Sequence, residues 1–361
     1  MNLPTVSVII RTTHRPTLWA AMQSVTRQTY APLEIVLVDA VGTGFPTPIS
    51  DAGGIAIVTH SMGKALGYGD AANAGLDIAQ GDYIVFLDDD DFFDAQHIAC
   101  RLEALNQVEA IDGNKPLLAY GPTRHVDKQG FEKGVMAEEY SPIRLHHHNY
   151  IQIGAALFSR QLLETGCRFD GRFAGLVDWD FWLQAAVHTS FAYTPHVTNN
   201  WCADGGESGA GIGENFDAAK FHQLHQDLKA KWRVRYEQLL SAFEQCSTSA
   251  FAALQRGDLA EAERNYRQAA RLDATDGPLL GNLAFIRVQQ GQFRAATVLL
   301  NRAIQYHPEY ADARINLAML YAQTGNVPGA VQVVNALLAT DPTHSQALAL
   351  RVRLAAALRK E

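Results

Sequence analysis

Short apolar runs alternate with amphipathic stretches through the first ninety residues of the chain. The apolar runs lie at 5–11, 33–38, 55–59 and 83–87, and each predicts a buried strand. The stretches that begin at Pro16 and at Asp70 predict helices, the first because proline is favoured at the first helical position. Strands that alternate with helices at short spacing indicate a parallel sheet covered by helices, so we expect an α/β fold.

The fourth apolar run leads directly into four consecutive carboxylates, Asp88 to Asp91. Adjacent like charges repel one another by about 1 kcal/mol per contacting pair even in water, so the cluster favours a bound cation. Hard oxygen ligands suit Mg2+ or Mn2+, which take the rest of their shell from water and substrate phosphates. A solvated acidic turn is the alternative. Because ligands of open parallel sheets bind outside the carboxyl ends of the strands, Asp39 is expected at the same edge.

From about Phe243 onwards the sequence repeats with a period of 34 residues. Glycines recur at Gly257, Gly291 and Gly325, alanines at Ala262, Ala296 and Ala330, and prolines at Pro308 and Pro342. This is the tetratricopeptide period, in which each unit is a pair of antiparallel helices. We predict three units, at 243–276, 277–310 and 311–344, followed by a capping helix at 345–360. A helix at 217–240 is expected to join the two parts of the chain.

Composition and charge agree with two ordinary folded domains. The chain has 361 residues, 47% hydrophobic and 19% charged. Residues 1–242 carry 18 Lys and Arg against 28 Asp and Glu, an acidic balance that argues against nucleic-acid binding. No run of eighteen apolar residues predicts a membrane span, and no N-terminal signal region is evident, so we expect a cytoplasmic protein or one peripheral to the inner face of the membrane. The four cysteines show no zinc spacing and read as free thiols.

Four sequence blocks resemble the family 2 glycosyltransferases, which have the GT-A fold. They are VSVIIRTTHRP at 6–16, QTYAPLEIVLVDA at 28–40, AANAGLDIAQGDYIVFLDDDD at 71–91 and FDGRFAGLVDWDFWLQAA at 169–186. The resemblance implies a Rossmann-like domain that binds a nucleotide sugar at 1–215, before a linker helix at 216–242 and an all-α tetratricopeptide domain at 243–361. It also implies metal-dependent, inverting transfer of one sugar, without polymerisation, from a nucleotide-sugar donor such as a UDP-sugar. The acceptor would be a hydroxyl of a glycan, a lipid-linked molecule or a protein.

The first and third blocks carry the donor and metal positions of the family. Asp88, Asp89 and Asp90 match the motif that meets the ribose and the metal, with Asp90 as the first metal ligand and Asp88 as the second. Thr12 and Arg15 stand in the first block, where the resemblance implies donor contacts. Asp91 is interpreted instead as a cap for the helix that begins near Asp94.

The second and fourth blocks supply the remaining carboxylates. Asp39 matches the acidic residue that hydrogen-bonds the nucleotide base, and a strand-end carboxylate that caps the following turn is the alternative. Asp178 matches the catalytic base that takes the acceptor proton, and an N-cap is the alternative. Asp180 is the weaker candidate, because two residues further on it points across the helix.

Three departures from the family pattern affect the expected site. Arg11 stands where proline is usual, Ala40 replaces a second Asp, and Ala72 replaces an Arg that contacts the diphosphate; Arg15, Lys64 or Arg11 could supply the missing charge. Asp204 stands in the segment where relatives carry a metal-shell His, and is a further candidate ligand. The glycine-rich stretch at 205–213 reads as a lid or a linker, and the tract at 146–148 as a surface or acceptor-side feature.

Two other functions are weighed against the transferase. A tetratricopeptide scaffold with an inactive GT-A domain is compatible with the changes at Ala40 and Ala72. A nucleotidyltransferase would favour a glycine-rich first loop, which RTTHRPT lacks. The repeats themselves predict a protein partner or a homodimer, with a structural buttress as the alternative.

Overall fold

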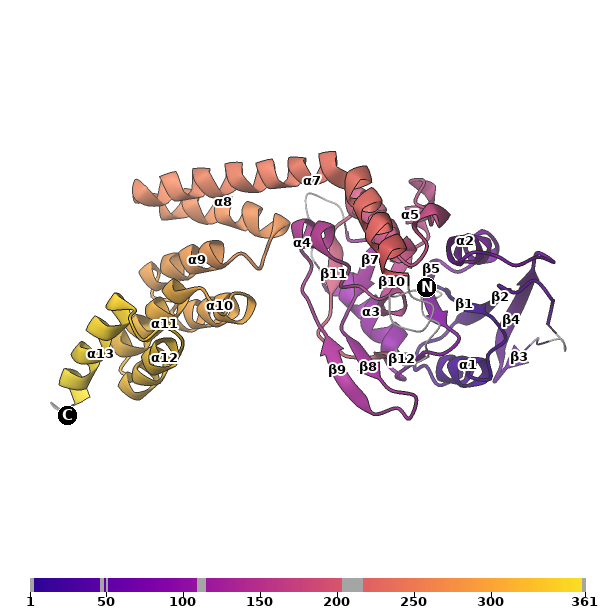
Figure 1. Cartoon of the computed structure of the whole chain (residues 1–361), viewed down its shortest axis with the longest axis horizontal. Coiled ribbons are helices and arrows are strands. Elements are labelled where there is room, and N and C mark those ends of the chain that lie inside the picture. The colour runs from indigo at the N-terminus through magenta and orange to yellow at the C-terminus, as the bar shows by residue number, and fades with distance from the viewer. Residues whose placement is uncertain (1–2, 46–48, 50, 109–114, 203–216, 359–361) are drawn as a thin grey trace. The chain divides into compact units, whose positions relative to one another are not determined.

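The computed structural model describes the chain except residues 1–2, 46–48, 50, 109–114, 203–216 and 359–361 (Figure 1). It divides into two compact units. One comprises residues 1–140 and 145–234, and the other comprises residues 141–144 and 235–361. The predicted order, an α/β domain followed by an all-helical domain, is confirmed.

An eight-stranded sheet forms the centre of the N-terminal unit, in the order β11-β7-β10-β5-β1-β2-β4-β3. The four predicted strands are β1 (Val6–Thr12), β2 (Leu33–Asp39), β4 (Ile55–Ser61) and β5 (Tyr83–Asp88). They are mutually parallel neighbours. The other strands are β3 (Asp51–Ala52), β7 (Leu118–Tyr120), β10 (Ala156–Ser159) and β11 (Phe191–Tyr193). Strand β10 runs antiparallel to β5 and to β7, so the sheet is mixed beyond β5.

The register of the central strands brings their carboxyl ends together. Arg11 on β1 lies opposite Asp88 on β5, and the next residue, Thr12, lies opposite Asp39 on β2. This confirms the expectation that the strand-end residues share one edge of the sheet.

Helices cover both faces of the sheet, because alternate residues of each buried strand point to opposite sides. On one face Ile9 and Phe86 pack with residues of α2 (Tyr68–Ile78) and α6 (Val177–His188). On the other face Ile10 packs with residues of α1 (Leu18–Thr26) and α3 (His97–Gln107). Figure 1 shows α1 and α2 on opposite sides of β1. Each fully buried aliphatic or aromatic side chain contributes roughly 1.5–3 kcal/mol to this packing.

A second, four-stranded sheet lies beside the first in the order β6-β12-β8-β9. Its strands are β6 (Phe92–Phe93), β12 (Asn199–Cys202), β8 (Thr123–Val126) and β9 (Glu132–Met136). Strands β8 and β9 form a hairpin that turns at Gly130, which has a φ of 84°. The short helices of the unit are α4 (Pro142–His147) and α5 (Gln161–Glu164), with single 3-10 turns at Ile153–Ala155 and Gly171–Phe173.

The C-terminal helices follow the predicted 34-residue repeat. They are α7 (Ala218–Gln255), α8 (Leu259–Leu272), α9 (Gly277–Gln289), α10 (Phe293–Tyr306), α11 (Ala311–Gln323), α12 (Val327–Thr340) and α13 (Ser345–Leu358). Three helix pairs and a final helix are therefore present as expected. The predicted joining helix does not end near residue 240. It continues as the first helix of the first repeat, because no Gly or Pro interrupts residues 218–255.

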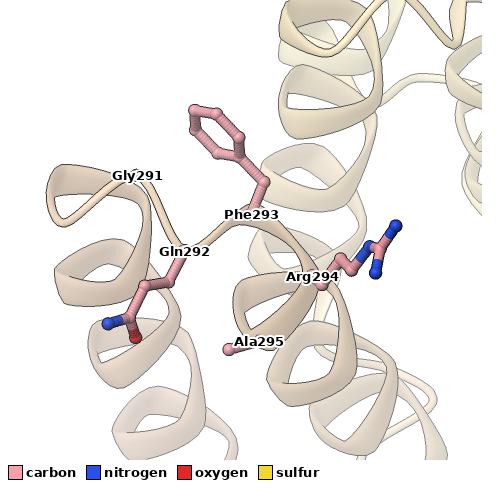
Figure 2. Close-up of a pocket in the computed structure, with 5 residues that line it drawn as sticks. All are labelled: Gly291, Gln292, Phe293, Arg294 and Ala295. Atoms are coloured by element: carbon pink, nitrogen blue, oxygen red, sulfur yellow. The ribbon is translucent and has the colours of Figure 1, made fainter.

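The recurring small residues have two separate roles in the repeats. Ala262, Ala296 and Ala330 are completely buried in the helical cores. Gly257, Gly291 and Gly325 have φ values of 81°, 72° and 83°, the left-handed conformation that ends a helix. Figure 2 shows the turn at Gly291, beside a hollow lined by residues 291–295. The side chains of Gln292, Phe293 and Arg294 point in different directions there, so they form no convergent site.

Within the described part of the chain, no helix combines the length and apolarity needed to cross a membrane.

Candidate active site

A cavity of about 1100 Å3 opens at the carboxyl edge of the main sheet, within the N-terminal unit. Its lining includes Thr12 and Arg15 after β1, the run Asp88, Asp89 and Asp90 after β5, and Asp178 at the start of α6. Residues separated by up to 166 positions thus meet in one place, as the sequence resemblance predicts. The volume is large for a small-molecule site, which typically measures about 300–1000 Å3.

Arg11 neutralises Asp88 at the floor of the cavity. The Arg11 guanidinium donates a hydrogen bond to Asp88 Oδ1, and its central carbon lies 3.6 Å from the centroid of the Tyr68 ring. The Tyr68 hydroxyl donates to the other oxygen of Asp88 at 2.6 Å. Burial opposes the charge of Arg11, but Asp88 and Tyr68 outweigh it and raise the arginine pKa above its usual value. Sequence reasoning missed Tyr68, because no motif marks a tyrosine at the start of a helix as a partner of a distant aspartate.

Asp89 anchors the loop that follows β1. It accepts hydrogen bonds from Thr12 Oγ1 at 2.8 Å, from the Thr13 amide at 3.0 Å and from Arg15 Nη1 at 3.2 Å. The same Arg15 nitrogen lies 2.5 Å from Asp90 Oδ2. Asp89 is buried and its oxygens are engaged by the loop, so its role in this structure is to hold Thr12 and Arg15 at the cavity wall.

Asp90 carries incompletely neutralised charge. Burial raises its pKa from 3.8 to about 6; Arg15 opposes this rise, whereas Asp88 and Asp89 reinforce it. A divalent cation would relieve this excess of negative charge, and two hard carboxylates are enough for Mg2+ or Mn2+ when substrate phosphates complete the shell. Among the described residues no group of three or more His, Cys, Asp or Glu side chains is arranged around a metal position. Asp88 and Asp90, which are both partly exposed at the cavity, are the side chains that would hold such a cation together with substrate oxygens. Asp204, the further candidate ligand, and the glycine-rich stretch lie outside the described residues.

In this structure the Asp39 carboxylate caps the turn that follows β2, which is the alternative role given above. Its buried carboxylate accepts hydrogen bonds from the amides of Val41, Gly42 and Gly44 at 2.6–3.0 Å and from the Ser61 hydroxyl at 2.7 Å. His14 Nε2 also lies 2.9 Å from Asp39 Oδ1. These donors outweigh burial and lower the Asp39 pKa below its usual range. A nucleotide base would have to replace one of these donors to bind Asp39.

Asp178 has the environment of a reactive carboxylate. It is the second residue of α6, whose N-cap is Leu176, so it is not the N-cap residue of the alternative reading. Its Oδ1 accepts from the Trp179 amide at 2.8 Å and its Oδ2 from Asn149 Nδ2 at 3.0 Å. Burial raises its pKa from 3.8 to about 6, against the lowering effect of these two hydrogen bonds and of Arg11.

Three other charged side chains named in the sequence do not line the cavity. Asp180 is buried, accepts hydrogen bonds from Lys231 Nζ at 2.9 Å and from Trp232 Nε1 at 2.8 Å, and does not line the cavity. The interpretation of Asp91 as a helix cap is wrong. Its carboxylate accepts instead from the Cys202 amide at 2.9 Å and from Gln152 Nε2 at 3.1 Å, while α3 begins without a side-chain cap. Lys64 is exposed and is not among the residues that line the cavity.

Each of the two units contains a region that matches a known family model. Residues 7–165 match the family model described as Glycosyl transferase family 2. The part of the N-terminal unit that carries the first three sequence blocks is therefore similar to the family 2 glycosyltransferases. Residues 253–303 and 287–354 match the Tetratricopeptide repeat model, in agreement with the helix pairs of the second unit.

Curated relatives that match about half of this chain carry glycosyltransferase names. The chain is 28% identical over 186 residues to the uncharacterized glycosyltransferase YwdF of Bacillus subtilis, covering 50% of this chain and 68% of that protein. It is 29% identical over 191 residues to a PGL/p-HBAD biosynthesis glycosyltransferase of Mycobacterium tuberculosis, covering 50% and 69%. Among solved structures, S. aureus TarS 1-349 in complex with UDP-GlcNAc is similar at 13% identity and a TM-score of 0.48, with 95% of this chain and 93% of that chain covered. The glycosyltransferase assignment therefore stands on the family model and the named relatives.

Proposed function

We propose that the N-terminal domain transfers a single sugar from a nucleotide-sugar donor to an acceptor hydroxyl, with inversion at the sugar carbon. The observation that carries this proposal is that one cavity contains Asp88 and Asp90 together with Asp178. The first two carboxylates suit the donor side, and the third is the group with the properties of a base. A UDP-sugar is the donor we propose, on the resemblance of the sequence blocks.

Arg15 is the cation we assign to the donor diphosphate. Ala72 stands where related sequences carry an arginine, and three basic residues of this chain could supply that positive charge instead. Arg11 is only 5% exposed and is held by Asp88 and Tyr68, and Lys64 is not part of the cavity wall. The Arg15 side chain is 26% exposed and lines the cavity. A guanidinium there can turn from Asp90 to a phosphate, for which its planar fork is well suited.

Mg2+ or Mn2+ held by Asp90 and Asp88 would neutralise the charge that develops on the departing nucleoside diphosphate. Asp88 is oriented for this role by Arg11 and Tyr68. Thr12 and Asp89 fix the loop that carries Arg15. A donor bound in this way would present its anomeric carbon to the remaining part of the cavity.

Asp178 takes the proton of the attacking acceptor hydroxyl in the proposed reaction. Its carboxyl has a pKa of about 6, so it is ionised at neutral pH and still basic enough to accept a proton. The acceptor oxygen forms the new bond as the diphosphate oxygen leaves from the opposite face, which inverts the anomeric configuration. The proton lost by the hydroxyl resides on Asp178 until it passes to water.

Replacement of Asp178 by Asn tests the base directly. We expect donor affinity near that of the wild type and turnover lower by ~100-fold or more, the scale of a lost general base. Release of nucleoside diphosphate from a panel of sugar nucleotides, with and without Mn2+, measures both activity and donor preference. Full turnover by the variant would remove Asp178 from the mechanism. No turnover by the wild type with any donor and acceptor would favour the scaffold with an inactive domain.

Replacement of Asp90 by Ala tests the metal side of the site. We expect the Mn2+-dependent part of nucleotide affinity to disappear while the fold stays intact, as measured by calorimetry and circular dichroism. Unchanged nucleotide affinity in the presence of Mn2+ would contradict the assignment of Asp90.

The acceptor class, the cytoplasmic location and the protein partner or homodimer of the repeats stay predictions.

A further inference from the structure

The segment from Asn149 to Gln152 connects Asp178, which lines the cavity, with the buried Asp91 at the end of the acidic run. At its start, Asn149 Nδ2 donates to Asp178 Oδ2 at 3.0 Å. At its end, Gln152 Nε2 donates to Asp91 Oδ2 at 3.1 Å, within the acidic run that follows β5. Both carboxamides line the cavity. One short segment therefore contacts the proposed base and Asp91, the residue that follows the donor-side carboxylate Asp90.

The carboxamide of Asn149 has only one orientation that satisfies both of its partners. Its Oδ1 accepts from the Ile151 amide at 3.1 Å, and its Nδ2 donates to Asp178. A backbone N–H can only donate and an ionised carboxylate can only accept, so a flipped amide would lose both hydrogen bonds. The N–H of Asn149 is thus fixed on the Asp178 carboxylate.

The backbone around Asn149 is held firmly in the core. Tyr150 and Ile151 are buried, and the Ile151 carbonyl accepts from Trp182 Nε1 at 2.9 Å. Gln152 Oε1 accepts from the Gly154 amide at 2.6 Å and from Asn199 Nδ2 at 2.8 Å. Because Trp182 is one turn along α6 from Asp178, the segment and the helix that carries the base are joined at two points.

We propose that Asn149 is a positioning residue for Asp178. It holds the carboxylate in the orientation that faces the cavity and stabilises its ionised form by donating a hydrogen bond to it. Without it, the Trp179 amide is the hydrogen-bond donor that remains to Asp178 among the residues that the structure describes, and it binds the other oxygen. This inference rests on the proposed function, because Asp178 matters for the rate only if it is the base.

Several other groups act on the Asp178 carboxyl and stay constant in the test. They are Arg11 on β1, Tyr68 on α2 and Asp88 on β5. The titratable side chains of His148, before the segment, and His225, on α7, line the same cavity. A variant at Asn149 leaves all of them in place, so a change in pH dependence reports on the lost hydrogen bond.

Asn149→Asp and Asn149→Ala provide the experiment. The Asp variant has the same shape and can still accept from Ile151, but it cannot donate to Asp178 and adds a like charge. We expect kcat to fall about tenfold, the equivalent of one hydrogen bond to a charged group, with donor KM changed less than about twofold. The midpoint of the kcat–pH profile should rise by about one pH unit in Asn149→Ala and further in Asn149→Asp.

Asn73→Ala is the matched control. Asn73 also uses both ends of its carboxamide, on the backbone of Phe169, but it does not line the cavity. We expect it to lower thermal stability without moving the pH midpoint. If the Asn149 variants lose stability but leave the midpoint of the kcat–pH profile unchanged, as expected for Asn73→Ala, the inference is wrong. The proposed function would survive that result as long as Asp178→Asn lacks turnover. A fully active Asp178→Asn would instead overturn the proposed function and the role of Asn149 with it.

Discussion

Asp178→Asn should change the pH dependence of stability as well as the rate. In the folded protein burial raises the Asp178 pKa from 3.8 to about 6, so the folded state binds the proton more tightly than the unfolded chain does. The stability that comes from this protonated carboxyl is complete below about pH 4, and it is lost as pH rises through about 6. At neutral pH the wild type therefore bears the cost of a desolvated carboxylate that the Asn variant lacks.

The size of the change in the free energy of unfolding follows from the pKa shift of Asp178. A difference of about 2 pKa units corresponds to about 3 kcal/mol over the full titration, because each unit is worth about 1.4 kcal/mol. Between pH 4.5 and 7.5 the expected change is about 2 kcal/mol, since part of the titration lies below this interval. The free energy of unfolding of Asp178→Asn, relative to the wild type, should rise by that amount from pH 4.5 to pH 7.5.

The pH difference isolates the carboxylate from the other effects of the substitution. The new amide places an N–H2 group next to Asn149 Nδ2 or the Trp179 amide, which are both donors, and this destabilises the variant. That cost does not depend on pH between 4.5 and 7.5, so it cancels when the two measurements are subtracted. Asp77→Asn is a control, because the Asp77 side chain is 65% exposed and water solvates it in both states.

Urea unfolding followed by tryptophan fluorescence is a suitable assay. All five tryptophans, Trp19, Trp179, Trp182, Trp201 and Trp232, lie in the N-terminal unit, so the signal is insensitive to unfolding of the repeats. A stability difference that stays constant within about 0.5 kcal/mol across the pH range would refute the reasoning, because a two-unit shift requires the larger change.

Two further predictions concern the same helix. The kcat of the wild type should rise about tenfold per pH unit up to a midpoint near 6 and then level off, as Asp178 loses its proton; a pH–rate profile that is flat between pH 5 and 8 would contradict this. Asp180→Ala should lower the free energy of unfolding by about 3 kcal/mol, because it leaves Lys231 and the Trp232 indole without their buried partner, and a loss of under about 1 kcal/mol would show that the ion pair is dispensable.

Sequence patterns predict two parts of the structure: the helix pairs of the repeats, and the residues that the parallel strands bring to one edge of the sheet. The 34-residue period gives the helix pairs, because each unit must bury the same face against its neighbours. Parallel pairing of β1 with β2 and with β5 places Arg11 and Asp88 together, since the carboxyl ends of parallel strands meet at one edge. Asp178 required the family resemblance, as its helix follows about ninety residues after the acidic run.

Contacts between single side chains and distant loops were not predictable in this way. Asn149 stands in a polar stretch with no periodic signal, yet its amide binds Asp178. Cys202 is likewise unremarkable in sequence, and its backbone amide is the partner of Asp91. Such contacts depend on how irregular segments pass one another in space, and neither hydrophobic period nor residue type encodes that path.

The four consecutive aspartates have different roles, because the fold places their side chains in different surroundings. Exposure alternates along the run: Asp88 and Asp90 are partly exposed at the cavity, whereas Asp89 and Asp91 are buried. The buried pair holds protein in place, Asp89 through the loop after β1 and Asp91 through Gln152 and β12. The mutual repulsion that suggested a cation is thus already reduced by two guanidiniums and by backbone N–H groups. At the cavity itself, burial together with Asp88 and Asp89 raises the pKa of Asp90 to about 6, so added positive charge there would stabilise its ionised form.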